Sequence, residues 1–306
     1  LLSNAVKFSR RDTEVEVRVL TRDGRARIEV QDHGIGIPAN SRDKVFGKFS
    51  QIDSADDRNY EGSGLGLSIA EQIVTAATSA VREAPNGRDF LVALQEQLDL
   101  DVDLVSGPEE ARLIYLGVLS GMAFGDQPHL IIDIGGGSTE LVLADGRDGR
   151  SFSSTRIGAV RLQREFCQQD PLSADRRSFL QAYIQGALDP AVAEVKAALR
   201  PGEQPLMVGT SGTAMALAAL AAAEDPKPPL KLQGYRLSRE RVDQLTARLL
   251  AMTPEQRRAL PAINDRRAEI IVPGALILQT AMSMLGADEL HHVVDMPGIG
   301  SAGDVV

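Results

Sequence analysis

The sequence predicts an α/β protein, because stretches with the apolar pattern of buried strands alternate with stretches at helical spacing. An apolar run over 130–134 predicts a buried strand, and the apolar run over 140–143, after a glycine turn, predicts its returning partner. A third apolar stretch at 206–208 passes through another glycine turn into an alanine-rich helix over about 214–223. A last helix is predicted over 268–285. These elements favour a sheet covered by helices.

The composition is that of an ordinary globular protein. The chain has 306 residues, with 33 basic and 42 acidic side chains, so its formal net charge is −9. This balance supplies no basic face for nucleic acid, so we expect no nucleic-acid partner. No uninterrupted apolar run approaches the ~18 residues that span a bilayer, so we expect no membrane segment. The single cysteine, Cys167, cannot form an internal disulfide, which favours a cytoplasmic location.

The first part of the chain predicts a β-hairpin followed by two glycine-rich segments. Valines alternate with polar residues over 13–20, the alternation resumes over 25–32, and an Asp-Gly pair supplies the turn between them. The hairpin leads into the sequence DHGIGIP at 32–38. A second glycine-rich segment, GSGLGL at 62–67, opens a helix whose first amides can face phosphate oxygens.

The next stretch predicts one strand and two helices. Small and apolar residues over 75–81 predict a strand, and an Asn-Gly turn separates it from an amphipathic helix over 89–98. Ser106 is then placed to cap a helix whose first turn contains a proline and two glutamates. The bland interpretation of Glu109 and Glu110 is that carboxylates are favourable beside the positive end of the helix dipole.

The turn between the strands over 130–134 and 140–143 has the composition of a phosphate site. Consecutive glycines let successive amides point into one concavity that binds anionic oxygens, and the neighbouring hydroxyls add donors. Asp133 is placed to hold a metal ion or a water molecule, and Glu140 to act on the same centre. The alternative is a structural glycine hairpin that Asp133 caps. The candidate phosphate ligands of this turn are Gly135, Gly136, Gly137, Ser138 and Thr139.

A second glycine turn follows the apolar stretch at 206–208. A strand, a short glycine-containing loop and a helix form the geometry of an anion or nucleotide subsite. A tight strand-to-helix turn that binds nothing is the alternative interpretation. The candidate residues of this turn are Gly209, Thr210, Ser211 and Gly212.

Four separated segments of the first 74 residues resemble the boxes of the histidine-kinase ATP-binding domain, an α/β sandwich. They are LLSNAVKFS, DHGIGIP, VFGKFSQ and GSGLGLSIA. The resemblance implies that Asn4 holds Mg²⁺, that Lys7 lies near the phosphates of ATP and that Asp32 contacts the adenine amino group. It also implies that glycines line the pocket and the lid, namely Gly34, Gly36, Gly62, Gly64 and Gly66. Because no phosphoacceptor histidine domain is found, we interpret this part as an ATPase fragment rather than a working kinase.

Six segments over about 75–290 resemble the exopolyphosphatase / guanosine pentaphosphate phosphohydrolase family, which has an actin-like (ribonuclease H-like) fold. They are TSAVREAPNG, SGPEEARLIYLGV, LIIDIGGGSTELVL, TRIGAVRL, VGTSGTAMAL and RAEIIVPGALIL, in the family's order. The resemblance implies Mg²⁺-dependent hydrolysis of terminal phosphoanhydride bonds, with inorganic polyphosphate or guanosine pentaphosphate as substrate. It also implies a homodimer, with aggregation through exposed apolar surface as the alternative.

By this resemblance, Glu110 is the glutamate that orients or deprotonates the attacking water, with Glu109 as the fallback. Glu140 matches the second catalytic glutamate, and Arg82 matches an arginine that faces phosphate. Asp133 and the residues of the first glycine turn match the family's second phosphate loop.

The two resemblances predict a chain of four parts: a kinase-type fragment over 1–74, a remnant of the first actin-like subdomain over 75–125, the second actin-like subdomain over 126–296, and a divergent tail over 297–306. The family's first phosphate loop, an Asp-x-Gly-Ser-Asn-Ser segment, is not matched in the sequence, so we expect low activity. The predicted function is a phosphoanhydride phosphohydrolase. The alternatives are a kinase-type ATP-binding protein and a phosphate- or alarmone-binding module without turnover.

Overall fold

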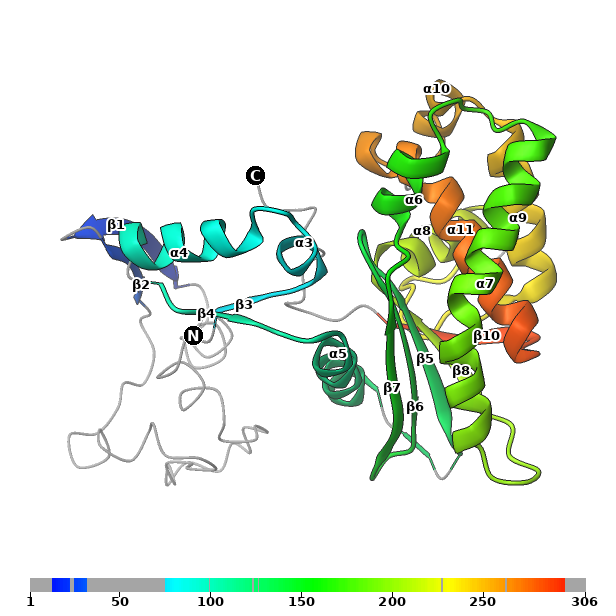
Figure 1. Ribbon diagram of the computed structural model, residues 1–306, viewed down its shortest axis with the longest axis horizontal. Helices are drawn as coiled ribbons and strands as arrows, with labels where there is room; N and C mark the ends of the chain where they lie inside the picture. The colour runs from blue at the N-terminus through cyan, green and yellow to red at the C-terminus, as the bar shows by residue number, and fades with distance from the viewer. Residues whose placement is uncertain are drawn as a thin grey trace. The chain divides into compact units, whose positions relative to one another are not determined.

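The structure, a computed structural model, describes residues 13–22, 25–31, 75–98, 100–122, 124–125, 127–226, 228–261 and 263–294 (Figure 1). The chain divides into two compact units, residues 1–77 with 84–104 and residues 78–83 with 105–306. All candidate residues of the phosphatase resemblance therefore lie in the second unit.

The described part of the first unit includes the predicted hairpin. β1 (Glu16–Arg22) and β2 (Arg25–Gln31) pair in antiparallel orientation over their whole length. Val17 lies opposite Val30 and Val19 lies opposite Ile28, which is the register that the alternating pattern predicts. The hairpin prediction is confirmed.

The strand predicted over 75–81 is wrong beyond its first three residues. β3 (Thr75–Ala77) pairs in parallel with β4 (Val102–Leu104), and the chain then forms α3 (Ser79–Arg82). The backbone N–H groups of residues 81 and 82 both donate to the Thr78 carbonyl, at 3.1 and 3.0 Å, which closes a helical turn. Small side chains occur in both strands and helices, so this short apolar pattern could not distinguish a strand from a helix. The amphipathic helix is confirmed as α4 (Gly87–Leu98).

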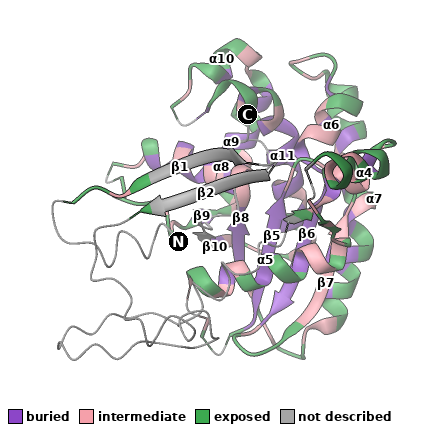
Figure 2. Cartoon of the chain, turned by 90° about the vertical axis from the view of Figure 1, so that its left-hand side faces the viewer, coloured by how far each residue is buried: buried purple, intermediate pink, exposed green. Residues whose placement is uncertain are grey.

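The second unit is built on a six-stranded sheet with the strand order β7-β6-β5-β8-β10-β9. β5, β6 and β7 form an antiparallel meander, whereas β8 is parallel to both β5 and β10. Every residue of β5 and β6 is buried, so the predicted strand pair over 130–143 is confirmed (Figure 2). The strands are β5 (His129–Ile134), β6 (Thr139–Ala144), β7 (Gly149–Thr155), β8 (Leu206–Thr210), β9 (Leu237–Ser238) and β10 (Glu289–Val294).

Helices cover both faces of this sheet (Figure 1). α5 (Gly107–Gly121) packs Ile114 and Val118 on one face, against Ile131 and Val142. On the other face, Leu130 and the alternate residues after it pack against the remaining helices, as the two-residue period of a strand requires. These helices are α6 (Ala159–Phe166), α7 (Ala174–Ala198), α8 (Ser211–Ala223), α9 (Arg239–Ala251), α10 (Pro254–Arg258) and α11 (Asp265–Leu285).

α11 is long and apolar enough to cross a membrane by length and composition alone. Its most apolar 18-residue window has a mean hydropathy of 1.5, but 61% of that window is buried inside the structure. Leu278 and Met282, for example, are fully buried in the core. A core helix of a globular protein has this same character, and the absence of a membrane segment stays a prediction.

Candidate active site

Four polar residues lie in one row across the strands of the second unit. In the sheet register, Asp133 on β5 lies opposite Glu140 on β6, and Glu140 lies opposite Ser154 on β7. On its other side, Asp133 lies opposite Thr210 at the end of β8. Only 8% of Asp133 and 2% of Glu140 is exposed, so the sheet holds two buried carboxyl groups next to each other.

The pKa values of both carboxyl groups are raised. Burial raises the pKa of Asp133 to about 6, against a hydrogen bond with Ser211 that lowers it, and the charge of Glu110 adds to the rise. Burial raises the pKa of Glu140 to about 8, against hydrogen bonds with Ser154 and Ser138, and the charges of Asp133 and Glu110 add to the rise. The Ser154 hydroxyl donates to Glu140 Oε1 at 2.7 Å. The site thus gathers acidic side chains in a poorly solvated place, which favours the protonated form of both buried carboxyl groups.

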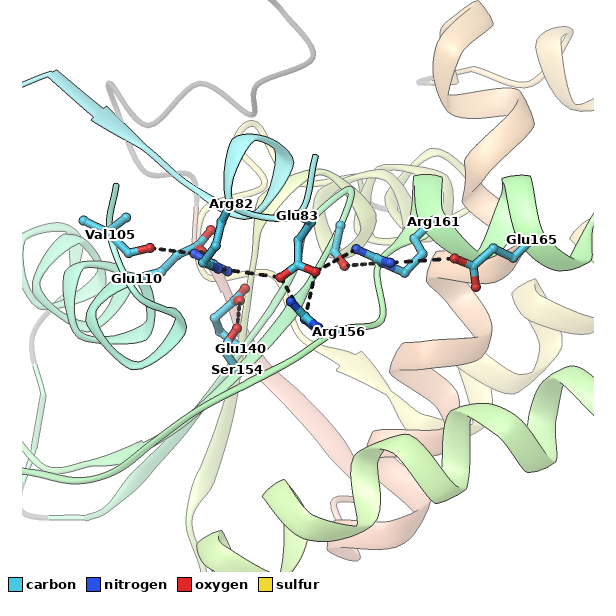
Figure 3. Close-up of polar contacts among 10 residues, drawn as sticks. Arg82, Glu83, Val105, Glu110, Glu140, Ser154, Arg156, Arg161 and Glu165 are labelled. Atoms are coloured by element: carbon cyan, nitrogen blue, oxygen red, sulfur yellow. Dashed lines mark hydrogen bonds and ion pairs between the residues drawn. The ribbon is translucent and has the colours of Figure 1, made fainter. Parts of the chain in front are cut away.

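The candidate catalytic Glu110 lies at the start of α5, and its charge acts on both buried carboxyl groups. Arg82 donates from both Nη atoms to Glu110 Oε2, each at 3.1 Å, and from Nη1 to the Val105 carbonyl at 2.7 Å (Figure 3). Arg82 therefore fixes Glu110 through one carboxylate oxygen. The predicted cap of α5 is confirmed, because Ser106 Oγ accepts from the Glu109 amide at 3.3 Å.

The side chain of Glu109 is bound elsewhere, as its position on the helix predicts. It accepts hydrogen bonds from Arg112 at 2.8 and 2.9 Å, and 40% of it is exposed. No contact joins Glu109 to Asp133 or Glu140 within the described residues. This geometry favours Glu110 over its neighbour as the residue that meets a substrate.

The first glycine turn owes its glycines to close packing. The Gly135 amide donates to the Ser138 carbonyl at 3.0 Å, and none of the three glycines has a left-handed backbone. A Cβ on Gly137 would lie 2.7 Å from Ser79 Oγ. The carbonyls of Gly135 and Gly136 accept from the first amides of α6, at 2.9 and 3.0 Å, so the turn caps that helix.

The hydroxyl residues that follow have different partners. Thr139 is fully buried, and its hydroxyl donates to the Ile157 carbonyl at 2.7 Å, so that it braces the loop after β7. Ser138 instead forms a hydrogen bond with Glu140. The geometry therefore places the Ser138 hydroxyl at the carboxyl cluster and gives the Thr139 hydroxyl a structural role.

The second glycine turn adjoins Asp133. Ser211 has a positive φ of 64°, a strained conformation for a residue with a side chain. Its hydroxyl donates to the Ile134 carbonyl at 3.0 Å and lies at the Asp133 carboxyl. Gly209 and Gly212 permit close packing, since a Cβ on either would lie 2.7 Å from Leu290 or from Arg267.

Three further residues that the sequence did not predict contribute to this site. Ser154 binds Glu140, and Gly107 lets α5 approach it, since a Cβ on Gly107 would lie 2.6 Å from Ser154 Cβ. Glu83 lies among three arginines beside the first glycine turn (Figure 3). Glu83 follows Arg82 in a segment that carries the phosphatase resemblance, and that adjacency was the available signal.

Other predicted residues lie outside the described part of the chain. These are the kinase-type candidates Asn4, Lys7, Asp32, Gly34, Gly36, Gly62, Gly64 and Gly66. Within the described residues, no group of three or more His, Cys, Asp or Glu side chains is arranged to hold a metal ion by itself.

Gly158 should tolerate no side chain, because a Cβ there would lie 2.4 Å from the Gly136 carbonyl oxygen and 2.6 Å from Gly137 C. We expect Gly158→Ala to lower the free energy of unfolding by about 1–3 kcal/mol, since the obstructing atoms are backbone. Gly186→Ala in α7, where nothing lies within 4 Å of a Cβ, should instead raise it by about 0.5–1 kcal/mol. Urea unfolding measures both, and equal stability of Gly158→Ala and the unchanged chain would contradict the packing.

Glu140 should make folding less favourable as pH rises. Burial raises its pKa from 4.5 to about 8 in the folded chain, so stability is lost as pH rises from about 4.5 to about 8, where the unfolded chain ionises Glu140 and the folded chain does not. We expect Glu140→Gln to gain stability over the unchanged chain across this window, by about 1.4 kcal/mol for each pH unit, and to keep a constant advantage above pH 8. Urea unfolding with a metal chelator measures the difference, and Glu165→Gln, at a half-exposed position, is the control. A difference that stays constant with pH would contradict the raised pKa.

Two protein families match overlapping parts of the chain. Residues 65–294 match the Ppx/GppA phosphatase family, and residues 1–98 match the family of histidine kinase-, DNA gyrase B- and HSP90-like ATPases. "Exopolyphosphatase 2" of Mycobacterium tuberculosis is 29% identical over 247 residues, covering 76% of this chain and 76% of the relative. "Exopolyphosphatase 1" of Mycobacterium leprae is 32% identical over 223 residues, covering 71% of this chain and 63% of the relative.

Further matches support the fold. An uncharacterized protein of Streptomyces coelicolor is 30% identical over 295 residues, covering 94% of this chain and 82% of its own length. The crystal structure of the Aquifex aeolicus member of the Ppx/GppA family has a TM-score of 0.61 and 27% identity, covering 73% of this chain and 70% of that one. The actin-like α/β fold that the resemblance implied is thus confirmed. The chain belongs to the Ppx/GppA phosphatase family.

Proposed function

We propose that the chain hydrolyses phosphoanhydride bonds and releases orthophosphate from inorganic polyphosphate. One observation carries the proposal: the buried pair Asp133 and Glu140 adjoins Glu110, a third carboxylate that an arginine holds in place. Family membership and the similarity to exopolyphosphatases supply the substrate class.

The residues have distinct roles in this proposal. Glu110 orients the attacking water through its carboxylate and accepts a proton from it. Arg82 donates hydrogen bonds to Glu110, so its guanidinium group lies where a phosphate group bound beside that carboxylate would be. There it binds the phosphate oxygens. The Ser138 and Ser211 hydroxyls, next to the buried carboxyls, donate to the remaining phosphate oxygens. Positioning and charge stabilisation are the main requirements of phosphoryl transfer.

Magnesium fits this set of residues. Two adjacent buried carboxyl groups have raised pKa values because burial and the nearby charge of Glu110 disfavour their ionised forms, and a divalent cation would relieve that cost. Mg²⁺ is commonly held by one or two carboxylates together with substrate phosphates. A magnesium site therefore does not require a larger cluster of acidic or histidine ligands, and the described residues contain none. Asp133 would hold the ion, which neutralises charge on the phosphate group when bound.

Orthophosphate release tests the proposal. The full chain with polyphosphate and Mg²⁺ should release orthophosphate. Either the substitution Asp133→Asn or a metal chelator should abolish this release. Parallel assays with guanosine pentaphosphate decide whether the alarmone is also a substrate. Polyphosphate binding without release would reject hydrolysis and favour a binding module.

The proposal extends to two further properties. A homodimer follows from the family resemblance, and light scattering of the purified chain tests it. A cytoplasmic location follows from the single cysteine, Cys167, which is unpaired and buried.

A second candidate function, ATP binding, is favoured by the match of residues 1–98 to the histidine-kinase-type ATPases. A fluorescent ATP analogue should bind the full chain and lose affinity in Asp32→Ala, since the resemblance gives Asp32 the adenine contact. Equal affinity in both proteins would reject this site.

A further inference from the structure

Glu83 is surrounded by three guanidinium groups, one from the adjacent residue Arg82 and two from the distant segment 156–161. Its oxygens lie 2.8 and 2.9 Å from Arg156 Nε, 3.4 Å from Arg161 Nη2 and 3.8 Å from Arg82 Nε (Figure 3). Only 13% of the Glu83 side chain is exposed, and 20% and 26% of Arg82 and Arg161. Three like charges this close repel one another, and the carboxylate between them offsets part of that repulsion.

Two of these arginines reach the candidate active site with their other atoms. Arg82 donates to the Glu110 carboxylate from the side opposite to Glu83. Arg161 donates from Nε to the Gly137 carbonyl at 3.2 Å, and so holds the first glycine turn. Glu83 therefore connects the carboxylate at the start of α5 with the turn between β5 and β6.

Arg156 contributes less to this connection. It makes the shortest contact with Glu83, but 74% of its side chain is exposed, and exposed ion pairs are strongly screened by water. Arg161 has a second partner, Glu165, at 3.7 Å, on the side away from Arg82. Glu165 offers a matched control, because it is a second carboxylate paired with Arg161 that has no contact with Glu83 or Arg82 among the interactions described.

We propose that Glu83 is a positioning residue, which keeps Arg82 aligned with Glu110 while Arg161 holds the glycine turn in register with them. This inference rests on the proposed phosphohydrolase function for its effect on turnover. Small misplacements of a catalytic group are costly, and about 1 Å can lower a rate by as much as about 10²-fold.

Kinetics give the first test. Glu83→Gln should lower kcat for orthophosphate release from polyphosphate by about 10-fold or more, with KM changed by less than about threefold. Arg161→Gln should act in the same direction. The double variant should be no more than about twofold slower than the slower single variant, because both changes break one connection. Glu165→Gln should retain the unchanged kcat. Losses that multiply in the double variant, or an unchanged kcat in Glu83→Gln, would overturn the inference.

Hydrogen exchange of the full chain gives a test that needs no turnover. In Glu83→Gln, the hydrogen-bonded amides at positions 109, 110 and 135 should exchange at least about threefold faster, while those of α7 and α11 keep their rates. Glu165→Gln should change neither segment. If the unchanged chain releases no orthophosphate, the proposed function fails while exchange still decides the role of Glu83. Unchanged exchange at both segments, or a uniform rise over the whole chain, would overturn that role, and Arg161→Gln takes the place of Glu83→Gln if the latter does not fold.

Discussion

Glu110→Gln should lower turnover of polyphosphate by roughly 10²- to 10⁴-fold, which is the range for loss of a general base. The amide keeps the shape of the side chain and its place at the start of α5, beside Arg82. It cannot accept a proton from water at neutral pH. Steady-state orthophosphate release measures the loss.

The matched control is Glu109→Gln, one residue earlier on the same helix. Its half-exposed carboxylate binds Arg112 and not the site, so turnover should change by less than about twofold. If Glu110→Gln retained full turnover while Glu109→Gln lost it, the assignment of the general base would be reversed. If both retained it, Glu140 would be the next carboxylate to test.

Arg257→Met should lower the free energy of unfolding by about 3–5 kcal/mol, because it leaves a charge without its partner in a place that water reaches poorly. Arg257 is fully buried and donates to the Ala268 and Met252 carbonyls at 2.7 and 3.0 Å. It also binds the Asp170 carboxylate, only 14% of which is exposed.

Urea unfolding at neutral pH measures this loss. The control is Arg258→Met, because the neighbouring arginine is 35% exposed and its ion pairs lie at the surface, where each is worth less than about 1 kcal/mol. A loss for Arg257→Met that matched the loss for Arg258→Met would contradict the structural role of the buried pair.

Much of the second unit was predictable, because its elements have strong local signals. The strands β5 and β6 are mainly apolar stretches on either side of a glycine turn, and Ser106 precedes a proline and carboxylates as a capping residue should. The helix predicted from residue 268 begins at Asp265, because Asn264 caps it.

The relations between distant residues were not predictable from one sequence. Ser154 faces Glu140 because of how β6 and β7 align, and that register depends on the packing of the whole sheet. Glu83 meets Arg161 across 78 positions of the chain. The glycines of the first turn also bring α6 and Ser79 close, a packing role that the sequence did not predict, and their binding of anions stays a prediction.

The row formed by Asp133, Glu140 and Ser154 has a consequence for sequence change in this family fold. The three residues lie on consecutive antiparallel strands, so their distances are set by strand alignment. Insertion or deletion of one residue in the turn before Glu140 would shift β6 by one position, and its alternating side chains would exchange faces. Glu140 would then point at the opposite helix layer, and an apolar neighbour would take its place. Close packing limits which residues that turn can contain, and the position of Glu140 in the site requires that the number of residues in the turn stay unchanged.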